Sequence, residues 1–161
     1  MSDIIEVENK QVIQMLYYYK KLSGDLQPIF NDFEKYYQKK IGDNWDMKGT
    51  PYGLKWEGLT PNYKAYKRKR LGHASADLIL SGKLKTAATG GEGWISNKTG
   101  TSFEFGVDIP YAKDHQYGLP LNNLPQRPFF LMNDNKNLPG EATNYLINAV
   151  TKAYNEIKDK I

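Results

Sequence analysis

Residues 110–130, PYAKDHQYGLPLNNLPQRPFF, constrain the fold of this chain more than any other stretch. They include four prolines, four aromatic residues, one histidine and one arginine. Proline fixes its own φ, has no N–H to donate and pushes the preceding residue into an extended conformation. Long helices and central strands are therefore excluded here, and the stretch predicts stiff, irregular backbone between regular elements.

The composition bounds the class of protein. With 161 residues, 40% of them hydrophobic and 25% charged, the chain is most simply one globular domain, 1–161. No apolar run approaches the roughly 18 residues of a membrane span, so we expect no membrane partner. Cysteine is absent, which excludes disulfides, thiolate nucleophiles and cysteine-based zinc sites. Twelve tyrosines favour surfaces that are partly apolar and partly wet, as in subunit contacts.

Apolar residues at helical spacing predict a helical N-terminal region over residues 1–45. Its first helix carries the stripe Val12, Leu16 and Tyr19. A second helix is expected to use Asp25 as its cap, to tolerate Pro28 in its first turn and to end at Gly42. The Gly- and Trp-rich residues 43–59 then predict an ordered loop.

The central region, 56–131, predicts short elements. Thr60 and Pro61 begin a helix that Gly72 closes, and residues 83–88 predict one or two further helical turns. Alternating residues predict strands at 94–97 and 103–107, joined by a turn, and residues 110–118 predict a short helix. A longer helix is expected over 139–160. The fold class is therefore α+β, a small antiparallel sheet packed with N-terminal and C-terminal helices.

The net charge of +4 comes from one short patch. Residues 64–70, KAYKRKR, hold five of the 22 basic residues and no acid, so the rest of the chain has 17 basic and 18 acidic residues. The candidate DNA contacts in this patch are Lys64, Lys67, Arg68 and Arg70, which share one broad stripe of the expected helix over residues 61–71. The alternatives are a solvated helix face, or pairing with acids of a neighbouring subunit.

The residues give little support for catalysis. The chain has two histidines, and His115 cannot form a dyad with Asp114 because sequence neighbours on a helix point about 100° apart. Ser81 lacks the G-x-S-x-G elbow, and neither a phosphate-binding loop nor a spaced set of metal ligands is present. We therefore expect no enzyme activity, no cofactor and no metal. A hydrolase built on His115 and Ser81 would need the two groups within hydrogen-bond reach.

Arg127 is the side chain that the prolines hold most firmly. Pro128 extends the backbone at Arg127, and Pro125 fixes its own φ two residues earlier. A planar guanidinium on stiff backbone suits a bidentate pairing with a carboxylate or with helix-end carbonyls. Phe129 and Phe130 are then expected to enter the core or an interface. This pattern favours a rigid anchor over a catalytic loop.

Several short motifs follow one another along the central region. Trp56 and Leu59 precede a helix with Thr60, Tyr63 and Lys64, and the segment LILSGKLKTA follows with its Gly82 and Leu84. The later pieces are Phe105-Gly106, Tyr111-Ala112, His115-Gln116, Gly118, and LPQRPFF with Pro125, Arg127, Pro128 and Phe129. In this order the motifs resemble the bacteriophage virion morphogenesis, or tail completion, family of Mu-like and P2-like phages and prophages. The chain departs from the family's pattern at Lys85, where arginine is common, and at Phe130, where leucine is usual.

This resemblance implies a structural protein that acts in tail completion or head–tail joining. It implies self-association, as a ring that matches the symmetry of the tail, and docking to phage tail and neck proteins. The protein would be assembled in the cytoplasm of the bacterial host and reside in the tail or neck of the virion. His115, Gln116 and Arg127 would tie the short helix to the Pro-rich segment. The basic helix would make weak, non-specific contact with DNA in the channel. The alternative is a DNA-binding accessory protein that uses the basic helix.

Overall fold

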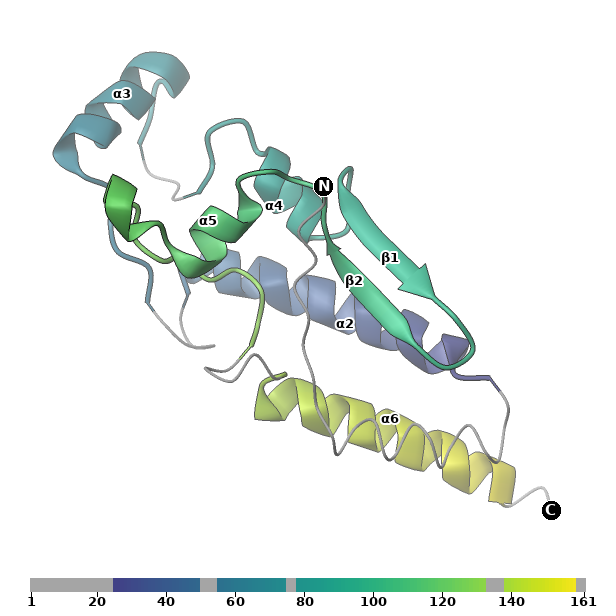
Figure 1. Ribbon diagram of the computed structural model, residues 1–161. Coiled ribbons are helices and arrows are strands. Elements are labelled where there is room, and N and C mark those ends of the chain that lie inside the picture. The colour runs from purple at the N-terminus through teal and green to yellow at the C-terminus, as the bar shows by residue number, and fades with distance from the viewer. Residues whose placement is uncertain (1–24, 50–54, 75–77, 133–137, 159–161) are drawn as a thin grey trace.

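Helices frame a two-stranded antiparallel sheet in this α+β chain (Figure 1). The computed structural model describes residues 25–49, 55–74, 78–132 and 138–158. Its elements are α2 (Gln27–Asp46), α3 (Pro61–Leu71), α4 (Lys83–Ala88), β1 (Trp94–Lys98), β2 (Phe103–Val107), α5 (Ala112–Tyr117), the 3₁₀ turn η1 (Pro120–Asn122) and α6 (Gly140–Lys158). The predicted fold class is confirmed. The helix predicted around Val12 and Leu16 lies outside the described residues.

The two long helices, α2 and α6, lie side by side in opposite directions (Figure 1). The rings of Tyr36 and Tyr145 stack with centroids 3.9 Å apart, and Lys40 pairs with Glu141 near the start of α6. On α6 the buried residues Ala142, Leu146 and Val150 recur at helical spacing and form the face that packs into the core. Tyr154, one turn after Val150, is exposed.

The β-hairpin covers the side of α2 that faces away from α6 (Figure 1). Its register pairs Trp94 with Val107 and Ser96 with Phe105. The face that carries Phe105 packs on α2, because the Phe105 ring lies 4.9 Å from the ring of the fully buried Tyr37. The hairpin is also fastened to α2 by Glu34, whose carboxylate accepts hydrogen bonds from Trp94 Nε1 and Lys98 Nζ.

Helix α2 departs from the prediction at both ends. Asp25 is not the N-cap residue, although its carboxylate accepts from Gln27 N at 2.9 Å; Leu26 holds the cap position. Gly42 does not end the helix, which continues to Asp46. The last turn is stabilised by Trp45, whose buried ring packs against the rings of Trp56 and Phe129. That burial outweighs the roughly 1 kcal/mol that a glycine costs within a helix.

Helix α3 projects from one end of the molecule (Figure 1). Its ends agree with the sequence signals: the Thr60 hydroxyl accepts from Tyr63 N, Pro61 is in the first turn, and Gly72 is left-handed with φ of 76°. Lys67 is the one buried residue among the described positions of this helix.

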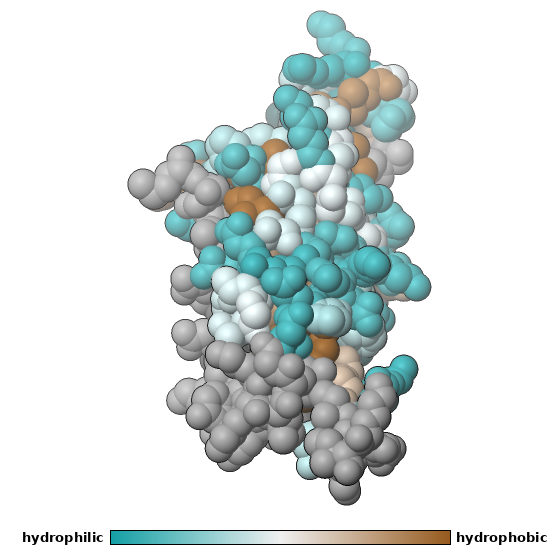
Figure 2. Space-filling view, turned by 90° about the vertical axis from the view of Figure 1, so that its right-hand side faces the viewer, coloured by the Kyte–Doolittle hydropathy of each residue, from teal (hydrophilic) through white to brown (hydrophobic). Residues whose placement is uncertain are grey.

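The face at the opposite end of the molecule, near the hairpin turn, is mainly hydrophilic where it is coloured, with small separate hydrophobic spots (Figure 2). No helix among the described residues is long and apolar enough to span a membrane.

Candidate functional site

The buried amide of Gln116 joins α5 to the Pro-rich segment, residues 124–130. Its Oε1 accepts from the backbone N–H groups of Phe129 and Phe130 at 3.0 and 2.9 Å. Its Nε2 donates to the carbonyl of Phe130 at 3.3 Å. The backbone N–H of Arg127 also donates to the carbonyl of His115 at 2.8 Å. Proline-rich backbone cannot satisfy itself in a regular ladder, so α5 supplies the partners that it needs.

Arg127 connects this segment to the residues before α3. It is 5% exposed, and its Nε and Nη2 both donate to the carbonyl of Glu57, at 3.1 and 3.0 Å. Both donors therefore converge on one carbonyl oxygen in a loop, whereas the sequence predicted a bidentate pairing with a carboxylate or with helix-end carbonyls. Trp56 Nε1 donates to the carbonyl of Pro128 at 3.0 Å, which adds a second link between the same two segments.

Gly118 allows the chain to fold back after α5. Its φ is 76°, and a Cβ there would lie 3.0 Å from Gln126 N and 3.2 Å from Leu124 O. Both atoms belong to backbone, so only glycine fits without displacing the Pro-rich segment. Leu119 and Leu124 then form an isolated β-bridge that closes the loop carrying η1. Gly118 thus determines how closely α5 and the Pro-rich segment approach each other.

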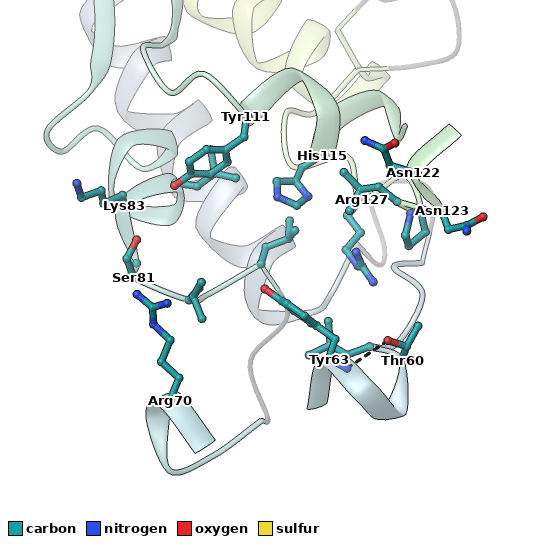
Figure 3. Close-up of a pocket in the computed structure, with 17 residues that line it drawn as sticks. Thr60, Tyr63, Arg70, Ser81, Lys83, Tyr111, His115, Asn122, Asn123 and Arg127 are labelled. Carbon is teal, nitrogen blue, oxygen red and sulfur yellow. Dashed lines mark hydrogen bonds between the residues drawn. The ribbon is translucent and has the colours of Figure 1, made fainter. Parts of the chain in front are cut away.

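These contacts surround a cavity of about 730 Å³ between α3, α4, α5 and the Pro-rich segment (Figure 3). We refer to it as the α3–α5 cavity. Its apolar walls are Leu59, Leu78, Leu80, Leu84, Leu124 and Pro125. Its polar and charged lining residues are Thr60, Tyr63, Arg70, Ser81, Lys83, Tyr111, His115, Asn122, Asn123 and Arg127, with Gly82 completing the wall. An apolar cavity with a few polar groups is typical of binding sites.

His115 lies between the Tyr111 ring and Arg127 in this cavity. The Tyr111 and His115 rings meet edge to face with centroids 6.0 Å apart, as expected for residues one helical turn apart. Burial, with the nearby positive charge of Arg127, lowers the pKa of His115, although Asp114 acts in the opposite direction. His115 Nδ1 is buried and has no hydrogen-bond partner among the described residues. Burial and the charge of Arg127 therefore both favour the neutral imidazole.

The cavity brings Ser81 and His115 to one site (Figure 3), but no hydrogen bond joins them. A nucleophile and its base need such a contact, so the pair that a hydrolase requires is not formed in this structure. Within the described residues, no cluster of three or more histidine or acidic side chains is arranged to hold a metal ion. The arrangement instead resembles a binding cavity with rigid walls.

The predicted motif residues divide into two groups. Leu59, Gly82, Leu84, Tyr111, His115, Pro125 and Arg127 line the cavity. The second group does not line it: Trp56, Ala112, Gln116, Gly118, Pro128 and Phe129. Of these, Trp56 and Gln116 form hydrogen bonds to the Pro-rich segment. Lys83, Asn122 and Asn123 also line the cavity, although they were not predicted as site residues. Asn123 is left-handed with φ of 52°, which an asparagine in the sequence LNN could have signalled.

The predicted set of DNA contacts on α3 is wrong at one position, Lys67. Lys64, Arg68 and Arg70 are exposed, but Lys67 is 1% exposed and cannot contact a phosphate from this position. The reason is the orientation of the helix. Tyr63 and Arg70, each about one turn from Lys67, line the cavity, so this face of α3 points toward the molecule and not toward solvent. The surface available to DNA is therefore smaller than the sequence predicted.

No family model, curated protein or solved structure matches this chain. The resemblance to phage virion morphogenesis proteins consequently stays a hypothesis based on the motifs quoted above.

Proposed function

We propose that this chain is a structural assembly protein of a phage or prophage, acting in tail completion or head–tail joining. It works by self-association and by docking to tail and neck proteins, in the virion tail or neck, after assembly in the host cytoplasm. The observation that carries the proposal is that the family-like motifs, which lie far apart in the sequence, meet around the α3–α5 cavity. Motifs that share one site are easier to explain by one common role than by separate local needs.

The roles of the polar groups in this site support a structural role over catalysis. The side chains of Gln116 and Arg127 use their hydrogen bonds to hold backbone groups of neighbouring segments. General acid–base catalysis needs titratable groups that converge on a substrate, and the buried Nδ1 of His115 is hydrogen-bonded to no described residue. We propose that the site shapes a docking surface and that the protein is not an enzyme.

Exposed aromatic and aliphatic side chains near the cavity offer contacts for that docking. Tyr63, Tyr66 and Tyr111 are each more than 40% exposed, and Leu121 is 94% exposed at the loop of η1. Tyrosine is enriched at the centres of protein interfaces, because one end of its ring is apolar and the other can hydrogen-bond. This surface, on the end of the molecule that carries α3, is where we place the contacts with neighbouring copies or with tail and neck proteins.

The test is deletion of the gene from the phage or prophage that encodes it, followed by electron microscopy of the lysate. The proposal predicts DNA-filled heads and separate tails, and joined particles when the wild-type gene is restored. A restored Arg127→Ala variant should fail, either by unfolding or by not assembling, whereas Arg68→Ala should restore joining. Normal particles after deletion would contradict the proposal, and so would an Arg127→Ala variant that folds and assembles normally.

A second candidate function is non-specific DNA binding through α3. The exposed Lys64, Arg68 and Arg70 favour it, as do the rings of Tyr63 and Tyr66, which stack with centroids 5.8 Å apart. Because one short patch releases few counterions, we expect only weak binding that is negligible at moderate salt. A gel-shift series across salt concentrations measures it. Tight binding to free duplex that weakens steeply with salt and disappears in Lys64→Glu/Arg68→Glu would favour the DNA-binding function instead.

A further inference from the structure

The α3–α5 cavity has a one-sided charge. Arg70, Lys83 and Arg127 line it, and none of its described lining residues is an aspartate or glutamate. Figure 3 shows Arg70 extending from the end of α3 toward Ser81, while Arg127 extends from the Pro-rich segment toward Tyr63 and Lys83 extends outward. Positive charge in a concave site with apolar walls raises the local concentration of anions. The cavity is therefore complementary to a negatively charged group.

Arg127 provides an independent observation that points to an anion. Arg127 is only 5% exposed, yet no carboxylate among the described residues lies within ion-pairing distance of its guanidinium. Its hydrogen bonds use Nε and Nη2, whereas Nη1 donates to no described residue. A buried cation held only by neutral carbonyls is costly. A carboxylate at Nη1 would supply the missing counter-ion.

The walls indicate what carries this carboxylate. Four leucines, Leu59, Leu78, Leu80 and Leu84, form one side, and the Tyr63 and Tyr111 rings form part of the rest. A small inorganic anion would leave these apolar surfaces uncovered. An aliphatic side chain beside an acidic one would cover them while its neighbour reaches an arginine. The ligand that fits is a short peptide segment in which acidic and aliphatic residues are mixed.

The chain itself contains such a segment. Residues 3–8 read DIIEVE, which is three acids and three aliphatic residues with no basic residue between them. Every other window of six residues in the chain contains two acids or fewer. The segment lies outside the described residues, so the argument rests on its sequence and on its charge complementarity to the cavity.

We propose that the α3–α5 cavity of one copy binds residues 3–8 of a second copy, with the carboxylates of the segment paired to Arg127 and Arg70. This inference rests on the self-association in the proposed function and names the contact that produces it. The contact is heterologous, since a cavity on one copy receives a different segment of the next. Repeated contacts of this type close into a ring when the rotation between copies permits.

The test uses fluorescence anisotropy with a labelled peptide of residues 2–9, SDIIEVEN. The receptor is the full chain carrying Asp3→Asn, Glu6→Gln and Glu8→Gln, so that its own segment does not compete. Arg70→Glu in this receptor should weaken peptide binding by roughly tenfold or more, the size expected for a lost charge-assisted hydrogen bond. The matched control is Arg68→Glu, an equal charge change on the other, exposed side of α3, which should leave the affinity within about twofold.

Three results would overturn the inference. The first is no binding of the peptide by the receptor at millimolar concentration. The second is equal binding of a peptide in which the three acids are amides. The third is equal loss of binding in the Arg70→Glu and Arg68→Glu receptors.

Light scattering after size exclusion tests separately whether the segment comes from a second copy, because wild type should associate more strongly than the neutralised chain. If wild type excludes the peptide at all concentrations while it stays monomeric, the segment binds within its own copy, and the two-copy contact is wrong.

This outcome is separable from that of the deletion experiment. Heads and tails that fail to join without the chain, together with a peptide that does not bind, would remove this contact and leave the proposed function intact. A peptide that binds as described, with particles that join normally after deletion, would remove the proposed function and leave the contact.

Discussion

Helices α2 and α3 both begin with a proline in the first turn, but they are stabilised in different ways. Helix α2 buries seven residues, among them Phe33 and Tyr37, against the hairpin, α6 and the Pro-rich segment. Helix α3 buries Lys67 and otherwise depends on its Thr60 cap and its left-handed Gly72. Helix α2 therefore provides the core, whereas α3 presents its side chains to the cavity and to solvent.

The largest expected difference between the two helices is in their response to loss of an aromatic ring. Phe33→Ala should lower the free energy of unfolding by about 3–5 kcal/mol, because it leaves a cavity beside Tyr37, Phe105 and Tyr145. Tyr66→Ala on α3 should change it by less than about 0.5 kcal/mol, since that ring is exposed. Urea denaturation of both variants measures the two values. Similar losses in the two variants would show that α3 is part of the core.

A smaller effect is expected for the polar link between α5 and the Pro-rich segment. Gln116→Leu keeps the volume of the side chain but leaves the N–H groups of Phe129 and Phe130 without their acceptor. Buried donors without partners cost about 1–3 kcal/mol each, or about 2–6 kcal/mol for the two. Because the added apolar burial of leucine offsets part of this cost, we expect a loss of about 2–4 kcal/mol in urea denaturation. The exposed neighbour Lys113 is a suitable control as Lys113→Leu, and an equally stable Gln116→Leu variant would mean that the two N–H groups find other partners.

The end of α3 should be weakened without weakening the rest of the molecule. Thr60→Ala removes the side-chain oxygen that accepts from Tyr63 N, at a cost of about 1 kcal/mol. Hydrogen exchange should become faster in the first turn of α3 and stay unchanged in α2. Faster exchange in both helices would contradict the separation between them.

The smallest expected effect is a change of stability with pH at the cavity. Because burial lowers the pKa of His115 below its usual 6.5, the unfolded chain takes up a proton more readily than the folded one as the pH falls through this range. Stability should therefore decrease below about pH 6.5, and the His115→Gln variant should lose this dependence. His73→Gln, which changes an exposed histidine, is the control. A His115→Gln profile identical to wild type would contradict this prediction.

The pKa of Glu34 is also lowered, from 4.5: burial raises it, but hydrogen bonds from Lys98, Ser96 and Trp94 outweigh that effect. The contribution of ionised Glu34 to stability is therefore lost at more acidic pH than that of His115.

The difference between α2 and α3 also explains how much of the fold the sequence could predict. Local signals determine both ends of α3 and the hairpin, and these predictions are confirmed. The end of α2 depends on Trp45, which packs on Trp56 and Phe129 far away in the sequence, so Gly42 was a misleading signal. The same limit applies to the site. Proline predicted the stiffness around Arg127, but the inward position of Lys67 and the cavity itself depend on contacts between distant segments.

We propose that this chain is a structural component that docks to the end of a phage tail. To test this docking, the purified chain is added to tails isolated from a strain that lacks it, and the tails are imaged by electron microscopy. We expect added density at the head-proximal end, containing several copies of the chain, and recovery of head joining. Tails that stay unchanged at saturating concentrations of the chain would rule this docking out.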